Sequence, residues 1–156
     1  MNKIAHYLDP ELIAFINVKT RDEALNALVS LAEEKQKISD RNGFYEAIID
    51  REKIVSTGIG MAVAIPHAKL ATYEDFFISI AILAQGVDWN TIDGSPVRIV
   101  FMIGGPDDKQ TEYLQILSGI TSAVKEEERR KKIINASTPQ EVMDLLVGEN
   151  GERLWT

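Results

Sequence analysis

Residues 76–83 read FFISIAIL, a run in which seven of eight side chains are apolar and most are β-branched or aromatic. Continuous apolar runs of this length and composition are typical of a strand that is covered on both faces of its sheet. Residues 97–103 (VRIVFMI) follow an Asp-Gly turn pair at 93–94 and are similarly apolar. A shorter apolar run at residues 61–65 (MAVAI) ends at Pro66. We predict that these segments form the central strands of one sheet.

Apolar residues at helical spacing precede and follow these strands. Thr20 and Glu23 form a capping-box pair at the start of one expected helix, and Asp40 is a candidate N-cap for the next. Helices are expected at about residues 21–37, 41–53, 108–124, 125–132 and from 139 onward. The prediction is an α/β fold, a single-domain sandwich in which a small mixed β-sheet is flanked by helices on both faces.

The chain has 156 residues, the size of about one domain, and contains no internal repeat or linker long enough to divide it. We therefore expect residues 1–156 to form one domain. Apolar residues make up 45% of the chain, enough to bury a core and to argue against disorder. No stretch resembles a signal peptide or approaches the ~20 apolar residues of a membrane span. A soluble cytoplasmic protein without membrane insertion is expected.

Charge and residue counts exclude several classes of function. The 17 Lys and Arg residues against 24 Asp and Glu give a net charge of −7, so the protein as a whole repels nucleic-acid backbones and anionic lipid. There is no cysteine, which excludes disulfides, thiolate zinc sites and cysteine nucleophiles. The two histidines, His6 and His67, lie far apart in the sequence, so we expect no metal site.

His67 is the best candidate for chemistry. It follows Pro66 at the end of a predicted strand, and the fixed φ of proline gives the imidazole a stiff stem. A neutral imidazole keeps a lone pair near neutral pH and can attack phosphorus while its other nitrogen is held by a carbonyl or carboxylate. A single histidine in a loop is also often an ordinary half-exposed residue, so spacing alone leaves both interpretations open.

A phosphorylated histidine needs positive partners, and Arg51 and Lys69 are the candidates near His67 in the sequence. Arg51 can bind two phosphoryl oxygens at once, whereas Lys69 offers a point charge. The alternative for Arg51 is a solvated side chain that stabilises the end of its helix. The turn-forming residues 56–60 (STGIG) resemble an anion-binding loop only weakly, because they lack the Walker pattern.

The stretch 51–67 joins these residues in one pattern. REK at 51–53, STGIG at 56–60 and AIPH at 64–67 resemble the enzyme IIA domain, mannitol/fructose type, of the bacterial phosphoenolpyruvate-dependent phosphotransferase system. The nitrogen-regulatory branch of that family looks most similar. In the second half of the chain, the matching residues are Trp89, Ile92-Asp93-Gly94, Pro96-Val97 and Val100-Phe101. The resemblance covers about residues 8–147, the expected core of the domain.

The resemblance implies a phosphotransferase without a metal or organic cofactor. His67 would accept a phosphoryl group from the phosphohistidine of the small carrier HPr, or of its nitrogen-branch counterpart. It would pass the group to a cysteine of a IIB partner of a sugar permease (IIB and IIC components), or hold it as a mark read by regulatory targets. Arg51 matches the arginine beside the family's active histidine and would bind the phosphate. The further substrate-binding candidates are Ser56, Thr57, Gly58, Lys69 and Tyr113.

Two positions depart from the family pattern. Tyr113 stands where the family usually has a second histidine, and Ala68 replaces the glycine that commonly follows the active one. A tyrosine can donate a hydrogen bond to a phosphoryl oxygen but adds no positive charge, and it is equally a candidate for a half-buried aromatic residue of the helix. Two further functions therefore stay open. One is a regulatory binding protein whose docking is switched by phosphorylation of His67, and the other is a degenerate module that has lost efficient transfer.

Overall fold

The sheet is built around two long antiparallel strands. The computed structural model describes residues 4–147, in which β5 (Phe77–Val87) pairs with β6 (Val97–Gly105) and Ile80 lies opposite Phe101. The shorter strands extend this pair in the order β1-β5-β6-β3-β2, with β4 also paired to β6. They are β1 (Ile13–Ile16), β2 (Gly58–Gly60), β3 (Val63–Ala64) and β4 (His67–Lys69). β1, β3 and β4 run parallel to their long partners and β2 runs antiparallel to β3, so the sheet is mixed.

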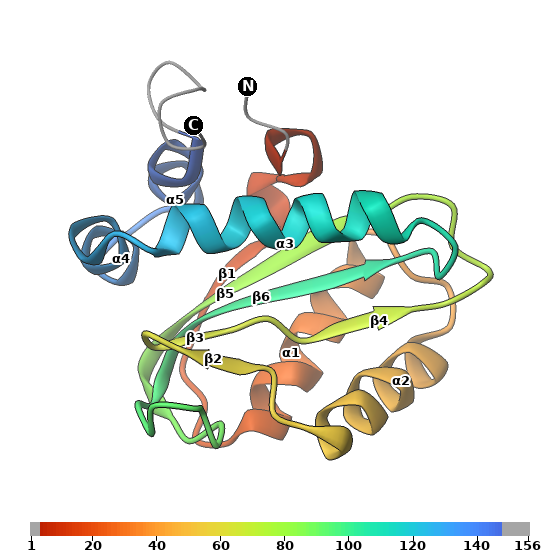
Figure 1. The fold of residues 1–156 in the computed structure, drawn as a ribbon, viewed down its shortest axis with the longest axis horizontal. Coiled ribbons are helices and arrows are strands. Elements are labelled where there is room, and N and C mark those ends of the chain that lie inside the picture. Colours follow the sequence, from red (N-terminus) through yellow and green to blue (C-terminus); the bar gives the residue numbers. More distant parts are fainter. Residues whose placement is uncertain (1–3, 148–156) are drawn as a thin grey trace.

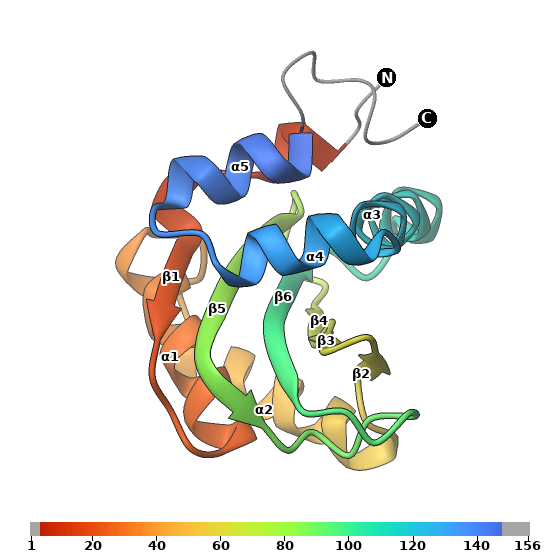
Figure 2. The same cartoon turned by 90° about the vertical axis from the view of Figure 1, so that its left-hand side faces the viewer.

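Helices cover both faces of this sheet (Figures 1 and 2). One face packs on α1 (Arg21–Glu34) and α2 (Arg41–Ile54), and the other on α3 (Gln110–Val124), α4 (Glu127–Ile134) and α5 (Pro139–Val147). Two short 3-10 helices, η1 (Ile4–Tyr7) and η2 (Pro10–Leu12), precede β1. Alternate residues of β5 and β6 fill two separate apolar clusters, which is why the strands are apolar on both faces. The predicted fold class is confirmed.

The predicted starts of the first two helices are also confirmed, whereas α3 and α4 begin two residues later than expected, at Gln110 and Glu127. Thr20 and Glu23 form a complete capping box at the start of α1, and the Asp40 carboxylate accepts the Gly43 N–H at the start of α2. The first helix is shorter than the predicted 21–37. It ends at Glu34. Two residues later, Gln36 has a φ of 62°, a left-handed conformation that an α-helix cannot contain.

The segment that leads to the predicted strand at 61–65 differs from the prediction. Residues 58–60, expected to be a turn, form β2, and the turn comes afterwards at Met61 and Ala62, whose φ angles are 59° and 64°. The Asp93 carboxylate holds this turn by accepting the Met61 N–H at 2.9 Å. The predicted strand is therefore reduced to the two residues of β3.

Candidate functional site

Pro66 interrupts one line of strand pairing without ending it. β3 and β4 both pair parallel with β6, and the Pro66 carbonyl between them accepts the Ile103 N–H at 2.9 Å. Proline lacks only the donor, so pairing resumes at once and His67 lies opposite Ile103 as the first residue of β4. His67 was expected just after a strand, and the structure places it inside one. A strand holds the imidazole more rigidly than a loop would.

Successive side chains of β4 lie on opposite faces of the sheet. Ala68 is buried in the cluster that α1 and α2 cover, so His67 and Lys69 lie on the opposite side, toward α3. There the imidazole lies beside the phenol ring of Tyr113, with the ring centroids 5.3 Å apart. Lys69 Nζ lies 4.1 Å from the centre of the same phenol ring and donates to Gln110 Oε1 at 2.9 Å. Tyr113 is thus both a buried aromatic residue and a neighbour of the imidazole.

Both nitrogens of His67 have defined partners. Nδ1 lies 3.2 Å from the carbonyl oxygen of Ile65, and Nε2 lies 3.2 Å from Arg51 Nε. A carbonyl can only accept and a guanidinium can only donate, so the proton belongs on Nδ1 and the lone pair on Nε2. The geometry therefore selects one tautomer and directs the lone pair of Nε2 toward Arg51.

Electrostatics keep this imidazole neutral. Burial lowers the pKa of His67 below its ordinary value, and the positive charges of Arg51 and Lys69 lower it further. The hydrogen bond to the Ile65 carbonyl opposes this lowering of the pKa. Burial also raises the pKa of Tyr113, so its hydroxyl keeps its proton at neutral pH. The site thus offers a lone pair and one neutral hydroxyl beside two cations.

Arg51 is anchored at both ends of its guanidinium. It belongs to the last turn of α2, where Nη1 donates to the Val55 carbonyl at 2.8 Å while Nε faces His67. Its position at a helix C-terminus also suits the helix dipole. Arg51 can therefore stabilise the end of α2 and contact His67 at the same time. An arginine held in this way presents its donors to whatever occupies Nε2.

The predicted binding residues at 56–58 have their polar groups engaged elsewhere. Ser56 Oγ donates to the Trp89 carbonyl and accepts the Gly58 N–H at 3.0 Å. Thr57 is buried; its hydroxyl donates to Glu52 and accepts the Trp89 indole N–H at 3.2 Å. Within residues 4–147 no hydrogen bond joins these groups to His67. They stabilise the segment between α2 and β2.

Glu52 is a residue that the sequence interpretation missed. Glu52 lies in the last turn of α2, where charged side chains are usually exposed, yet it is only 4% exposed. A signal was present, because Phe44, Ile48 and Glu52 follow one another at intervals of four and form the buried stripe of α2. A carboxylate on such a stripe needs partners inside the protein.

No group of three or more His, Cys, Asp or Glu side chains in the described part of the chain could hold a metal ion. No helix within residues 4–147 is both long enough and apolar enough to cross a membrane.

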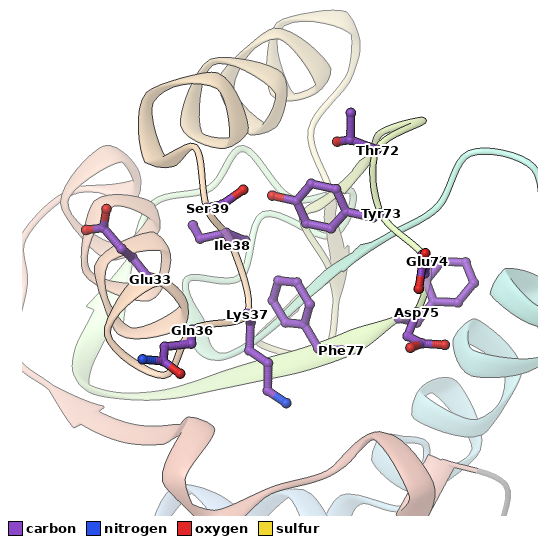
Figure 3. Close-up of a pocket in the computed structure, with 11 residues that line it drawn as sticks. Glu33, Gln36, Lys37, Ile38, Ser39, Thr72, Tyr73, Glu74, Asp75 and Phe77 are labelled. Atoms are coloured by element: carbon purple, nitrogen blue, oxygen red, sulfur yellow. The ribbon is translucent and has the colours of Figure 1, made fainter.

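A pocket of about 660 Å³ lies elsewhere, between the end of α1 and the segment that leads into β5 (Figure 3). Charged and aromatic residues such as Lys37, Tyr73, Asp75 and Phe77 line it. His67 and Arg51 are not among its residues, so this hollow and the His67 site are separate places.

Comparison with known proteins gives the family. The family described as phosphoenolpyruvate-dependent sugar phosphotransferase system, EIIA 2, matches residues 6–148. The chain belongs to this family. The predicted resemblance over about residues 8–147 is thereby confirmed.

Its relatives include both transport and regulatory proteins. The chain is 32% identical over 127 residues to the fructose-specific EIIA component of Haloferax volcanii, covering 81% of this chain and 82% of that one. It is 33% identical over 131 residues to the fructose-specific EIIABC component of Bacillus subtilis, of which it spans only 21%. The solved structure of the nitrogen regulatory protein IIA-Ntr from Neisseria meningitidis superimposes with a TM-score of 0.85 at 26% identity, covering 92% of this chain and 99% of that one.

Proposed function

We propose that this protein carries a phosphoryl group on Nε2 of His67. It accepts the group from the phosphohistidine of an HPr-like carrier, or of its nitrogen-branch counterpart. It then transfers the group to a IIB cysteine or holds it as a regulatory mark. The observation that carries the proposal is the pair of contacts on the imidazole, which leaves the lone pair of Nε2 facing a guanidinium while Nδ1 donates to the Ile65 carbonyl.

The transfer balances without an added acid or base. A bond forms from His67 Nε2 to phosphorus as the bond from phosphorus to the donor histidine breaks, and the donor nitrogen takes back its lone pair. The proton on Nδ1 stays in place. His67 gains positive charge as the new bond forms, and the Ile65 carbonyl at 3.2 Å from Nδ1 stabilises it.

Arg51 changes partner during this step. In the unphosphorylated protein its Nε donates to the lone pair of His67. Once phosphorus occupies that lone pair, the same donor faces a phosphoryl oxygen, while the bond from Nη1 to the Val55 carbonyl keeps the guanidinium in place. Lys69 contributes positive charge, and the Tyr113 hydroxyl can donate one hydrogen bond to a phosphoryl oxygen. The second positive imidazole of the family pattern is thus replaced by a neutral donor with a lysine above its ring.

Exposed apolar residues flank this site and suit a short-lived contact with a partner protein. Ile54, the last residue of α2, and Val55 are 78% and 59% exposed, and Leu114, which follows Tyr113, is 52% exposed. Such residues at a polar site are typical of protein docking surfaces. The chain has no cysteine, so the acceptor thiol belongs to a different domain or polypeptide. The Bacillus subtilis relative is named an EIIABC component, a name that joins IIA, IIB and IIC parts in one protein. We propose that the protein acts in the cytoplasm, as the sequence predicts.

The likeness to a nitrogen regulatory protein favours a second role for the same site. Phosphorylation adds negative charge beside Ile54, Val55 and Leu114, which weakens any contact that buries these residues. A regulatory target would then bind only the unphosphorylated form. Equal recovery of a target by both forms would count against this role.

Intact-mass measurement tests the proposed carrier. Incubation with phosphoenolpyruvate, enzyme I and HPr is expected to add one acid-labile phosphate, and His67→Ala is expected to abolish it. His6→Ala, a change at the exposed second histidine, is the matched control and keeps the phosphate. Tyr113→Phe keeps the phosphate but accepts it several-fold more slowly. An unchanged mass with both HPr and its nitrogen-branch counterpart would overturn the proposal.

A further inference from the structure

The carboxylate of Glu52 is buried and each of its oxygens accepts a hydrogen bond, although it touches no reacting atom. Its Oε1 accepts the Thr57 N–H at 3.0 Å and its Oε2 accepts the Thr57 hydroxyl. Burying an ionisable carboxylate costs free energy that an apolar residue at the same position would avoid. A carboxylate at this place therefore calls for an explanation beyond the packing of α2.

Glu52 is connected to both nitrogens of the His67 imidazole, on one side through hydrogen bonds and on the other through the neighbouring residue Arg51. The Thr57 carbonyl accepts the Ile65 N–H at 3.0 Å, and the Ile65 carbonyl faces His67 Nδ1 at 3.2 Å. On the other side, Arg51 precedes Glu52 in the chain and donates to His67 Nε2. These five residues form a closed network, which we call the Glu52 network. It ties the end of α2 to the segment that presents His67.

Trp89 sets the direction of the hydrogen bond made by the Thr57 hydroxyl. An indole N–H can only donate, and that of Trp89 donates to Thr57 Oγ1 at 3.2 Å. The hydroxyl proton of Thr57 is thereby directed to Glu52, which acts as an acceptor at both oxygens. An amide in place of this carboxylate has only one acceptor oxygen and cannot satisfy both donors.

We infer that Glu52 is a positioning residue that fixes the distance between Arg51 and the Ile65 carbonyl, and through that distance the tautomer of His67. When the network is intact, Nδ1 keeps its proton and Nε2 keeps its lone pair toward Arg51. When Glu52 or the Thr57 hydroxyl is lost, the end of α2 and the segment at 56–65 are no longer held together. The Ile65 carbonyl then moves away from Nδ1, and the second tautomer becomes populated.

Three variants and one control separate this role from a general effect on folding. Glu52→Gln keeps the size of the side chain but removes one acceptor. Thr57→Val removes only the hydroxyl, and Thr57→Ser restores it. Glu46→Gln removes a carboxylate from an exposed position of the same helix and serves as the matched control. If Glu52→Gln does not fold, the two Thr57 variants decide the outcome.

The first readout is the tautomer of His67, measured from the ¹⁵N chemical shifts of its two imidazole nitrogens. The wild type, Thr57→Ser and Glu46→Gln are expected to show the proton on Nδ1, and Glu52→Gln and Thr57→Val a mixture of the two tautomers. This readout needs no phosphoryl donor, so it tests the inference even where the proposed function fails. A loss of thermal stability without any change in the tautomer would overturn the inference.

The second readout rests on the proposed function. It is the single-turnover rate of phosphoryl acceptance from phosphorylated HPr. A displacement of about 1 Å in a reacting group can cost up to about a hundredfold in rate. We expect Glu52→Gln and Thr57→Val to be about tenfold to a hundredfold slower, with Thr57→Ser and Glu46→Gln close to the wild type. Wild-type rates in folded Glu52→Gln would overturn the inference, whereas no transfer to the wild type would overturn only the proposed function.

Discussion

His67 and Tyr73 lie only six residues apart and both are half-buried aromatic residues with polar atoms, but their surroundings differ. Each imidazole nitrogen of His67 has a partner, one from the chain segment before β4 and one from α2. The Tyr73 hydroxyl is buried and has no hydrogen-bond partner within residues 4–147, although its ring stacks on Phe44 with centroids 5.8 Å apart. Burial raises the pKa of Tyr73, and the Asp40 carboxylate adds to this effect.

The comparison sets two features against each other as signs of a functional site: a large pocket, and polar atoms held by hydrogen bonds. Tyr73 lines the pocket of about 660 Å³ in Figure 3, whose rim carries charges of both signs, including Lys37 and Asp75. His67 lies outside that pocket, yet its polar atoms are held by separate segments of the chain. Pre-organised polar groups, rather than the size of a hollow, are what phosphoryl transfer requires. Changes at His67 and its partners, and at Tyr73, test this difference.

Arg51→Lys is expected to have the largest effect of these changes. Lysine keeps the charge but cannot bind His67 and the Val55 carbonyl with a planar fork, as Arg51 does. Loss of a positioned donor to developing charge costs about a hundredfold to a thousandfold, and the retained charge reduces this to about tenfold to a hundredfold. Single-turnover phosphorylation measures it. Arg41→Lys, at the other end of α2, is the control and keeps the wild-type rate; an equal rate in Arg51→Lys would remove Arg51 from the mechanism.

The pH dependence of phosphorylation is expected to show the lowered pKa of His67. Because burial, Arg51 and Lys69 disfavour the protonated imidazole, the rate stays level down to the ordinary pKa of 6.5 and falls only below it. Lys69→Gln removes one of these charges, so its inflection moves back toward 6.5. An NMR titration of His67 in each protein measures the same shift directly. An inflection above 6.5 in the wild type would contradict the electrostatic account.

The same shift predicts the sign of an effect on stability. The unfolded chain binds the proton of His67 more readily than the folded protein does, since the folded pKa is the lower one. Stability from this group is therefore complete above about pH 6.5 and declines as the pH falls through the folded pKa. Denaturant unfolding of the wild type and His67→Ala at several pH values separates this contribution from that of other groups.

The sequence pattern predicted the long strands of the sheet but not the short ones. The strands at 76–83 and 97–103 were predictable because continuous apolar runs rich in β-branched and aromatic residues are typical of a strand covered on both faces. β1 was missed because its four residues are too short to show a period. β4 was missed because a proline usually marks the end of a strand. In the structure the Pro66 carbonyl accepts the Ile103 N–H, and pairing with β6 continues through β4.

Prediction of the site was limited in the same way. Motifs at 51–53 and 64–67 pointed to Arg51 and His67 as partners, and the structure brings the two into contact. They did not show that Thr57 faces inward, because a hydroxyl in a Ser-Thr-Gly stretch suits an exposed anion-binding turn as well as a buried contact with Glu52. The burial of Glu52 itself was visible as the continuation of the α2 stripe. Long-range hydrogen bonds are therefore the part that local pattern leaves undetermined.

Tyr73→Phe is expected to have the smallest effect, and it tests the comparison from the other side. A buried hydroxyl without a partner costs free energy, so its removal is expected to leave the free energy of unfolding unchanged or raise it by up to about 1 kcal/mol. The ring keeps its contact with Phe44, and the phosphorylation rate stays that of the wild type. Tyr45→Phe, on the half-exposed side of α2, is the control for removal of a hydroxyl as such. Denaturant unfolding measures the stability: a loss of more than about 1 kcal/mol would mean that the Tyr73 hydroxyl has a stabilising partner, and a slower phosphorylation would connect the pocket to His67.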